Sequence, residues 1–188
     1  IQNDFLKGGS LEVSNANEVI PVINQLQNQF DLIVATQDWH PHNHKSFASQ
    51  HDDKFEFDTI DLNGLEQVLW PDHCIQGTFG AEFHKDLNTN KIEAIFRKGM
   101  DKEVDSYSGF YDNGRRKNTG LLGYLKDRNV NEVSIAGIAS DFCVIFTAYD
   151  ALDLGFKTNI IENASRPIHA ENWEIIKNEF VVKGGKLI

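Results

Sequence analysis

The stretch EVSIAGIASDFCVIFTAYDALDL, residues 132–154, sets an apolar run directly against an amphipathic one. Residues 132–138 are typical of a buried strand, and residues 141–154 carry apolar side chains at the three- and four-residue spacing of a helix. Cys143 therefore falls in the first turn of a helix, at the carboxyl end of a strand. A helix start stabilises a thiolate and a developing oxyanion, and open α/β sheets bind ligands at this edge. We predict a nucleophile, although an arbitrary cysteine is more often a small buried hydrophobic residue.

Strands and helices alternate along the rest of the chain. Further strands are expected at 31–36, 91–97, 156–161 and 186–188. Helices are expected at 15–30, with Asn15 or Asn17 as cap, at 119–129 and at 170–180. Residues 37–90 read as largely irregular and functional. This order predicts one α/β domain over residues 1–188, with a parallel sheet covered on both faces. A helix at 15–30 calls for a preceding strand that residues 1–14 do not supply, so the first strand is expected upstream of Ile1.

Composition and charge narrow the function classes. The 188 residues carry a net charge of −10, and the only basic cluster, Arg115-Arg116-Lys117, is interpreted as a solvated loop. Nucleic-acid binding, which needs a basic face, is not expected. No apolar run reaches membrane-spanning length and no signal peptide is visible, so no membrane partner is expected either. Two cysteines suggest no disulfide scaffold, which favours a cytoplasmic location, and Cys74 is expected to be buried and structural.

The densest polar cluster is DWHPHNH, residues 38–44. Asp38 and His40 are two residues apart, so in extended chain their side chains point the same way. A carboxylate and an imidazole suit a first-row divalent metal, but a third ligand must come from elsewhere. The candidates are His42, His44, His51, His73 and His84, of which His73 in the turn WPDHC stands out. The alternative is a surface histidine cluster without a metal.

Three more charged residues lie beside these features. Lys98 ends the run 91–97, so a parallel sheet places it at the same edge as Asp38 and Cys143. A cation there lowers the pKa of a thiol and keeps a carboxylate ionised, although most strand-end lysines are only solvated. Asp141 is predicted to cap the helix that follows it, and Asp4 to form a turn or a cap. No G-x-S-x-G, P-loop or G-x-G-x-x-G motif is present, so a nucleotide cofactor has no support.

Six ordered blocks resemble the nicotinamidase branch of the isochorismatase-like cysteine hydrolases. The blocks are QNDFLKGGSL (2–11), DWHPHNHKSF (38–47), WPDHC (70–74), RKG (97–99), YSGF (107–110) and GIASDFCV (137–144). The resemblance implies an open parallel sheet of about six strands flanked by helices. It implies hydrolysis of nicotinamide to nicotinate and ammonia in NAD salvage, with pyrazinamide as a surrogate. It also implies a divalent ion, zinc first and iron or manganese as alternatives, and leaves homo-oligomerisation open.

The resemblance assigns roles position by position. Cys143 matches the nucleophile and Lys98 the family lysine. The metal ligands match Asp38, His40 and His73. The aromatic residues that sandwich the pyridine ring match Phe5, Trp70 and Tyr107. A cis peptide is implied at Ile138–Ala139, where it would aim the Ala139 N–H, with that of Cys143, at the oxyanion.

Two positions depart from the family pattern. Some members place a further histidine ligand where this chain has Ser46, so water or the Ser46 hydroxyl is expected to complete the metal shell. The family base is the first aspartate of D-x-Q-N-D-F, which falls one position upstream of Ile1; Asp4 matches the second aspartate, not the base. Three alternatives stay open: an amidohydrolase of the same superfamily for a carbamoyl or ureido substrate, a non-catalytic metal-binding α/β module, and a redox-sensing thiol protein with Cys74 as resolving cysteine.

Overall fold

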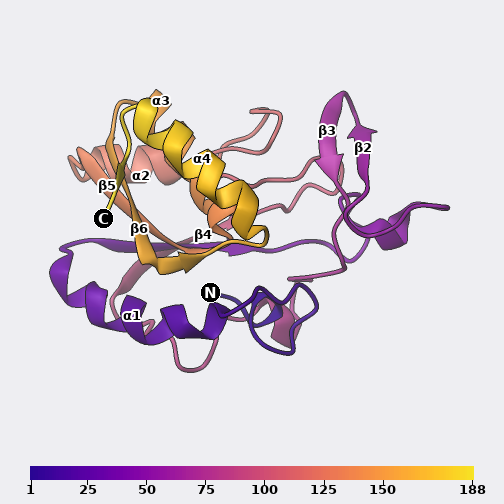
Figure 1. The fold of residues 1–188 in the computed structure, drawn as a ribbon, viewed down its shortest axis with the longest axis horizontal. Coiled ribbons are helices and arrows are strands. Elements are labelled where there is room, and N and C mark those ends of the chain that lie inside the picture. Colours follow the sequence, from indigo (N-terminus) through magenta and orange to yellow (C-terminus); the bar gives the residue numbers. More distant parts are fainter.

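The computed structural model describes residues 1–188 (Figure 1). Its five parallel strands are β1 (Ile33–Asp38), β4 (Ile92–Lys98), β5 (Glu132–Ile138), β6 (Lys157–Arg166) and β7 (Lys186–Leu187). Its α-helices are α1 (Val19–Leu26), α2 (Leu121–Asp127), α3 (Ile145–Asp153) and α4 (Ala170–Val182). An antiparallel hairpin, β2 (Thr59–Leu62) and β3 (Leu65–Val68), projects to one side. The expected α/β class with parallel strands is confirmed.

The parallel strands lie in two parts. β1 pairs with β4 in a register that sets Asp38 opposite Lys98. β6 pairs with β5 on one side and with β7 on the other. The strands therefore do not form the one continuous sheet that was expected, because one edge of β1 and one edge of β5 lack a strand partner.

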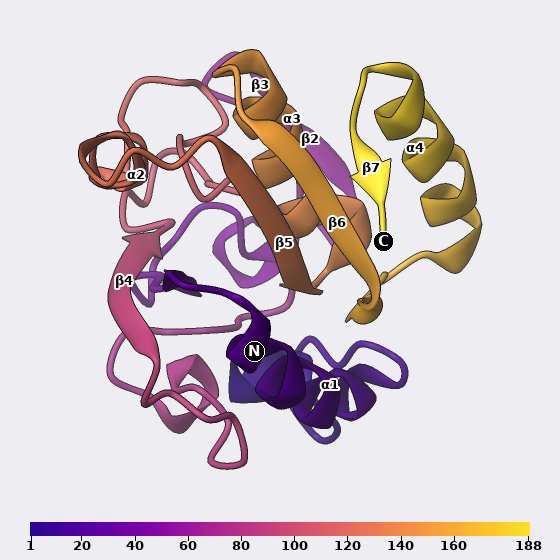
Figure 2. The same cartoon turned by 90° about the vertical axis from the view of Figure 1, so that its left-hand side faces the viewer.

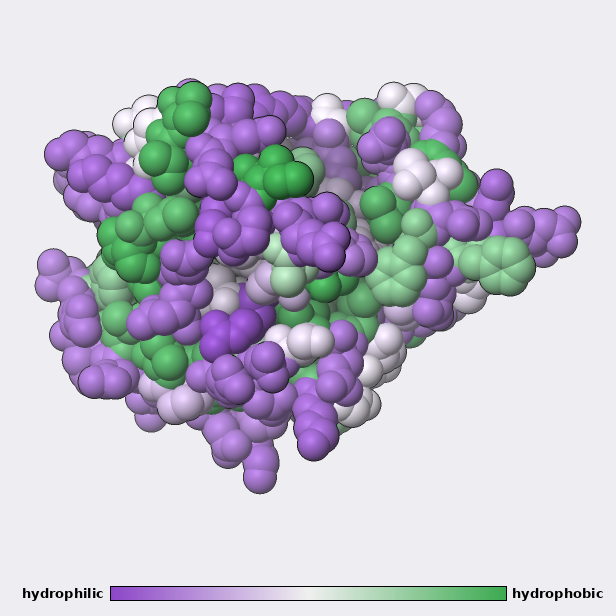
Figure 3. Space-filling model, in the orientation of Figure 1, coloured by the Kyte–Doolittle hydropathy of each residue, from purple (hydrophilic) through white to green (hydrophobic).

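A groove of about 860 Å³ lies between these two open edges. Residues 33–36 of β1 and residues 133–138 of β5 line it, and most of its lining is apolar. Figure 2 shows β4 on one side and β5–β6–β7 on the other, with the N-terminus between them. Apolar side chains also gather at the left of Figure 3, between the positions of α1 and β5 in Figure 1. At the carboxyl ends of the strands, Ile1, Asp38 and Cys143 line the same groove.

Helices cover both faces, with α1 below the strands and α3 and α4 above them in Figure 1. The helix α3 packs on β6 through Ile145 and Ala148, which meet Ile160 in a cluster whose members are almost fully buried. Trp173 and Phe180 of α4 close this cluster. Burial of an isoleucine side chain stabilises a fold by about 1.5–3 kcal/mol. The packing fixes the helix that follows Cys143. No helix combines the length and the apolar character needed to cross a membrane.

The predicted helix 15–30 is found as one helical segment over 16–29, in which α1 has a 3₁₀ turn at each end. Pro21, in the first turn of α1, lacks the N–H that would extend the α-helix towards Asn17. Other local expectations were wrong. Neither expected cap is made: Asn15 takes a left-handed conformation without a side-chain bond, and Asn17 Oδ1 accepts the Lys7 N–H at 2.9 Å. Residues 37–90 were expected to be largely irregular, but they contain the β2–β3 hairpin. Its turn, Asn63-Gly64, is a dipeptide that strongly favours a hairpin turn, and the sequence reasoning overlooked it.

Candidate active site

Three polar side chains meet at the carboxyl ends of β1, β4 and β5. Lys98, the last residue of β4, is buried and forms an ion pair with Asp38 at the end of β1. Its Nζ also donates to the Ser106 carbonyl at 2.7 Å and lies 3.4 Å from Cys143 Sγ. Burial opposes the charge on Lys98, but Asp38, Cys143 and Asp105 together raise its pKa. Lys98 is therefore a fixed cation between a carboxylate and a thiol.

Cys143 lies in a π-helical turn, Ser140–Val144, that leads into α3. The wide turn joins the strand to the helix, and the Thr147 hydroxyl donates to the Cys143 carbonyl at 2.6 Å. Burial raises the pKa of the Cys143 thiol to about 11, Asp38 and Asp105 add to the rise, and Lys98 acts against it. The low pKa expected at a helix start is not found. At neutral pH the thiol needs a base before it can attack.

The backbone before the thiol offers a free donor. The Ile138–Ala139 peptide is cis, as the family resemblance implies. The Ala139 N–H makes no hydrogen bond within the protein, and Ala139 and Cys143 line the same small pocket. A free N–H beside a thiol is the arrangement that an oxyanion hole requires.

Asp141 does not cap the helix. Its carboxylate accepts the N–H groups of Ile168 and His169 at 2.9 and 2.8 Å, from the loop between β6 and α4. The prediction failed because a local capping rule cannot foresee a partner 27 residues away. The contact brings Ile168 into the pocket wall.

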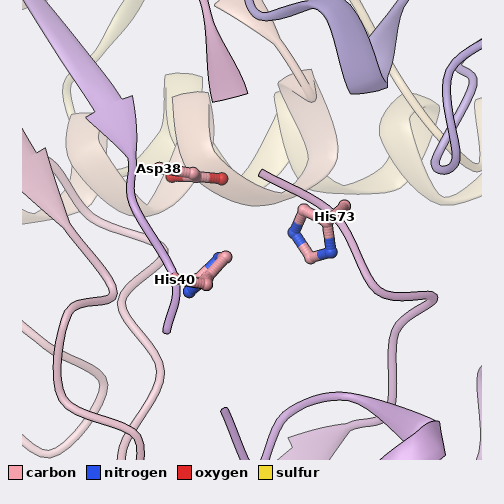
Figure 4. Close-up of side chains that lie close together, drawn as sticks. All are labelled: Asp38, His40 and His73. Atoms are coloured by element: carbon pink, nitrogen blue, oxygen red, sulfur yellow. The ribbon is translucent and has the colours of Figure 1, made fainter. Parts of the chain in front are cut away.

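Asp38, His40 and His73 form a group that could hold a divalent metal. One potential ligand atom from each residue lies within 4.8 Å of the others, and all three residues are buried. Their side chains converge from β1, the loop after it and the 70–74 turn (Figure 4). His40 Nδ1 is 2.9 Å from the Gly99 carbonyl and His73 Nδ1 is 2.8 Å from that of Pro71. Each ring therefore carries its proton on Nδ1 and turns the Nε2 lone pair inward, as metal-binding histidines do.

The electrostatics of this group also fit a metal. Burial lowers the pKa of His40 to about 3, so its ring is neutral at physiological pH. Burial acts against the charge of Asp38, but the Lys98 ammonium beside it holds its pKa below the usual value. Neutral imidazoles and an ionised carboxylate are the forms that bind metal ions.

Gly99 supports His40 through its backbone and leaves no room for a side chain. A Cβ at this position would overlap the His40 imidazole, and the φ angle of +66° disfavours any L-residue. We expect Gly99→Ala to weaken Zn²⁺ binding about tenfold, since displacing a ligand's support has this effect on metal sites. Gly64→Ala is the matched control, because Gly64 has φ of +84° but nothing within 4 Å of an added Cβ. Chelator competition measures both; equal Zn²⁺ affinities would contradict the prediction.

The other candidate histidines divide into two groups. His42 is exposed, His51 bonds the Lys45 carbonyl through Nε2 at 2.7 Å, and His84 lies near Asp86, so these three are not ligands of this group. His44 is fully buried beside His40. Ser46 Oγ lies 2.7 Å from His44 Nδ1, so the hydroxyl expected to complete the metal shell is engaged by His44.

The three predicted aromatic residues, Phe5, Trp70 and Tyr107, all line the small pocket, which adjoins Cys143 and the metal group. The Tyr107 hydroxyl accepts from Trp70 Nε1 at 3.3 Å and from Gln67 Nε2 at 3.0 Å. Burial raises the pKa of Tyr107, which keeps this hydroxyl neutral. The small pocket thus brings three aromatic side chains together with the thiol and the metal group.

Sequence reasoning missed several pocket residues. They are Leu11, Asp105, Ser106, Phe142 and Ile168. Phe142 packs edge-on against Trp70 with ring centroids 4.8 Å apart. Phe142 directly precedes Cys143, and this position could have indicated a pocket residue. Asp105 follows Val104 in an irregular segment and belongs to no sequence motif that would indicate a site.

Comparison with known proteins identifies the family. The isochorismatase domain model matches residues 1–188. A nicotinamidase of Acinetobacter baylyi is 52% identical over 168 residues, which cover 89% of this chain and 78% of the relative. The structure of an Acinetobacter baumanii nicotinamidase/pyrazinamidase has a TM-score of 0.97 and 48% identity, over 100% of this chain and 91% of that one. A Pyrococcus horikoshii pyrazinamidase in complex with zinc has a TM-score of 0.80 and 34% identity, over 100% and 93%. The chain belongs to the isochorismatase family.

Proposed function

We propose that the protein hydrolyses nicotinamide to nicotinate and ammonia, with pyrazinamide as a second substrate, in NAD salvage. The observation that carries the proposal is the contact of Lys98 Nζ with Cys143 Sγ, 3.4 Å, at the floor of an aromatic pocket beside the metal group. The similar proteins of both Acinetobacter species bear nicotinamidase names, which supports this substrate. Two free cysteines suit a reducing compartment, and we propose the cytoplasm.

The chain's own residues have separate tasks in this reaction. The Cys143 thiolate attacks the carboxamide carbon, and the Ala139 and Cys143 N–H groups bind the oxyanion. The proposed base takes the thiol proton and gives it to the departing nitrogen, so that ammonia leaves, and water hydrolyses the resulting thioester to nicotinate and the free thiol. Lys98 stabilises negative charge at the thiol and at neighbouring carboxylates through its fixed position. Phe5, Trp70 and Tyr107 hold the pyridine ring.

Asp38, His40 and His73 are the proposed ligands of a divalent ion, for which zinc is our first choice because the similar Pyrococcus horikoshii structure contains zinc. When bound, the ion supplies a Lewis-acid contact for the ring nitrogen of the substrate, directly or through water. His40 and His73, fixed by Gly99 and Pro71, set its position. Iron and manganese suit the same donors.

The base is proposed to be an aspartate joined to the amino side of Ile1, at the end of a strand that fills the groove between β1 and β5. Those strands each have an open edge, and the groove between them is mostly apolar. Ile1 lines this groove together with Asp38, Lys98 and Cys143. A residue attached there would lie beside the thiol, whose raised pKa calls for a base.

Ammonia release from a panel of amides tests the reaction. A chain that includes the proposed strand should release ammonia from nicotinamide and pyrazinamide, and changing the aspartate before Ile1 to asparagine should stop it. Dialysis against a strong chelator should lower kcat/KM about tenfold or more, and added Zn²⁺ should restore it. Preference for a carbamoyl or ureido substrate would favour the related amidohydrolase. Metal binding without any turnover would favour a non-catalytic module.

A further inference from the structure

A second polar group adjoins the metal pocket on the other side of His40. It consists of His40, His44 and Asp105, with one potential ligand atom from each within 4.8 Å of the others. All three residues are buried, and Asp105 lines the small pocket together with His73 and Cys143. None of the roles proposed above uses His44 or Asp105.

His44 presents an unsatisfied donor. Its Nδ1 accepts the Ser46 backbone N–H at 3.1 Å and lies 2.7 Å from the Ser46 hydroxyl, so the proton of the neutral ring is on Nε2. That nitrogen is buried and makes no hydrogen bond of normal geometry, although the Asp101 and Val104 carbonyls lie near the ring. A buried N–H without an acceptor is costly, and such groups are commonly satisfied by an ordered water.

Asp105 presents the matching acceptor. Oδ1 accepts the Ser106 N–H at 2.7 Å, and Oδ2 accepts from Gln67 Nε2 at 3.2 Å. A carboxylate has about four lone-pair sites, so acceptor capacity is left over. One of its oxygens lies within 4.8 Å of a ring nitrogen of His44, so the two side chains can share one small ligand.

A second metal ion does not fit this group. His40 Nδ1 faces the Gly99 carbonyl, which leaves His40 only one ring nitrogen, and that one serves the Asp38–His73 side. His44 Nε2 carries a proton and cannot be a ligand. Asp105 alone would remain, and one carboxylate does not make a transition-metal site. A water molecule fits, because it can accept from His44 Nε2–H and donate to Asp105 at once.

We propose that Asp105 and His44 together bind a water molecule that is itself bound to the divalent ion, and that they are positioning residues for that ion. The inference rests on the proposed metal site of Asp38, His40 and His73. Asp105 then also supplies the second negative charge that, with Asp38, balances a divalent cation in a buried site. Residues that hydrogen-bond to the groups coordinating a metal orient those groups and raise the affinity for the metal.

Asp105→Asn tests the inference by keeping the shape and removing the charge. Competition with a chromophoric chelator should show Zn²⁺ affinity about 10–100-fold weaker than in the wild type. The visible spectrum of the Co²⁺-loaded protein should also shift, which a purely structural defect in the loop would not produce. Glu103→Gln is the matched control, because Glu103 lies two residues away and pairs with Lys45 at the surface. It should keep both the affinity and the spectrum.

His44 gives an independent pair of variants should Asp105→Asn fail to fold. Asn at this position keeps an acceptor towards Ser46 but loses the donor at Nε2, whereas Gln can reach that place with an amide N–H. His44→Asn should therefore weaken Zn²⁺ binding, and His44→Gln should restore part of it. Wild-type affinity in both folded Asp105→Asn and His44→Asn would overturn the inference. A wild-type protein that binds neither Zn²⁺ nor Co²⁺ would overturn the metal site itself, and the inference with it.

Discussion

Cys143→Ala is expected to lower the kcat for ammonia release from nicotinamide by about 10⁴-fold or more, as the loss of a catalytic nucleophile does in other hydrolases. Alanine removes the only sulfur within reach of Lys98 Nζ and leaves the rest of the pocket in place. Because alanine is smaller than cysteine, the fold should survive with a modest loss of stability. The measurement is ammonia release at saturating substrate, with nicotinamide affinity determined separately by calorimetry.

Cys74→Ala is the matched control for this prediction. Cys74 is the other free cysteine, is fully buried, and has a thiol pKa raised well above its usual value by burial. Its replacement should cost stability through a small cavity and leave turnover in place. Retained turnover in Cys143→Ala, or a loss that occurs only in Cys74→Ala, would exclude Cys143 as the nucleophile.

Lys98→Met is expected to lower the free energy of unfolding by about 3–5 kcal/mol in the presence of a chelator, because breaking a buried ion pair leaves an uncompensated charge. Lys98 and Asp38 are both buried, and Asp105 adds a second carboxylate to the same pocket. Methionine fills similar space without a charge. Zn²⁺ should reduce the loss, since the ion supplies positive charge beside Asp38. Turnover should fall as well, because the thiol loses its cation.

Urea denaturation with chelator and with Zn²⁺ measures this effect. Lys117→Met is the control, because the Lys117–Asp101 ion pair lies at the surface and should contribute little. If Lys98→Met and Lys117→Met change stability equally, burial of the Lys98–Asp38 pair is not what stabilises this edge of the sheet.

Much of the fold and part of the site follow from local patterns in the chain. Apolar runs end at Asp38, Lys98 and Ile138, and parallel strands align their carboxyl ends, so the meeting of Asp38, Lys98 and Cys143 could be expected. The pair Asp38–His40 likewise follows from two-residue spacing. The third ligand position rested on the WPDHC turn and on family resemblance, since spacing alone left five histidines open.

Other features depend on contacts between distant segments, which local patterns do not encode. Asp141 looked like a cap but binds the loop at Ile168. Asp105 matches no sequence pattern and lines the pocket only because its loop lies close to His40 and His44, which come from a distant segment. The raised pKa of Cys143 has the same origin, since burial by the whole pocket outweighs the helix start and the neighbouring lysine.

The two-part sheet has a consequence for how activity can be lost. Lys98 belongs to the β1–β4 part, whereas Cys143 follows β5 of the other part, and no backbone ladder joins the two parts directly. The 3.4 Å contact between their side chains therefore spans a seam. A small shear along this seam would separate cation from sulfur while each half kept its own hydrogen bonds. Mild denaturant should accordingly change the reactivity of Cys143 towards a thiol reagent, measured in Cys74→Ala, before circular dichroism reports any loss of secondary structure.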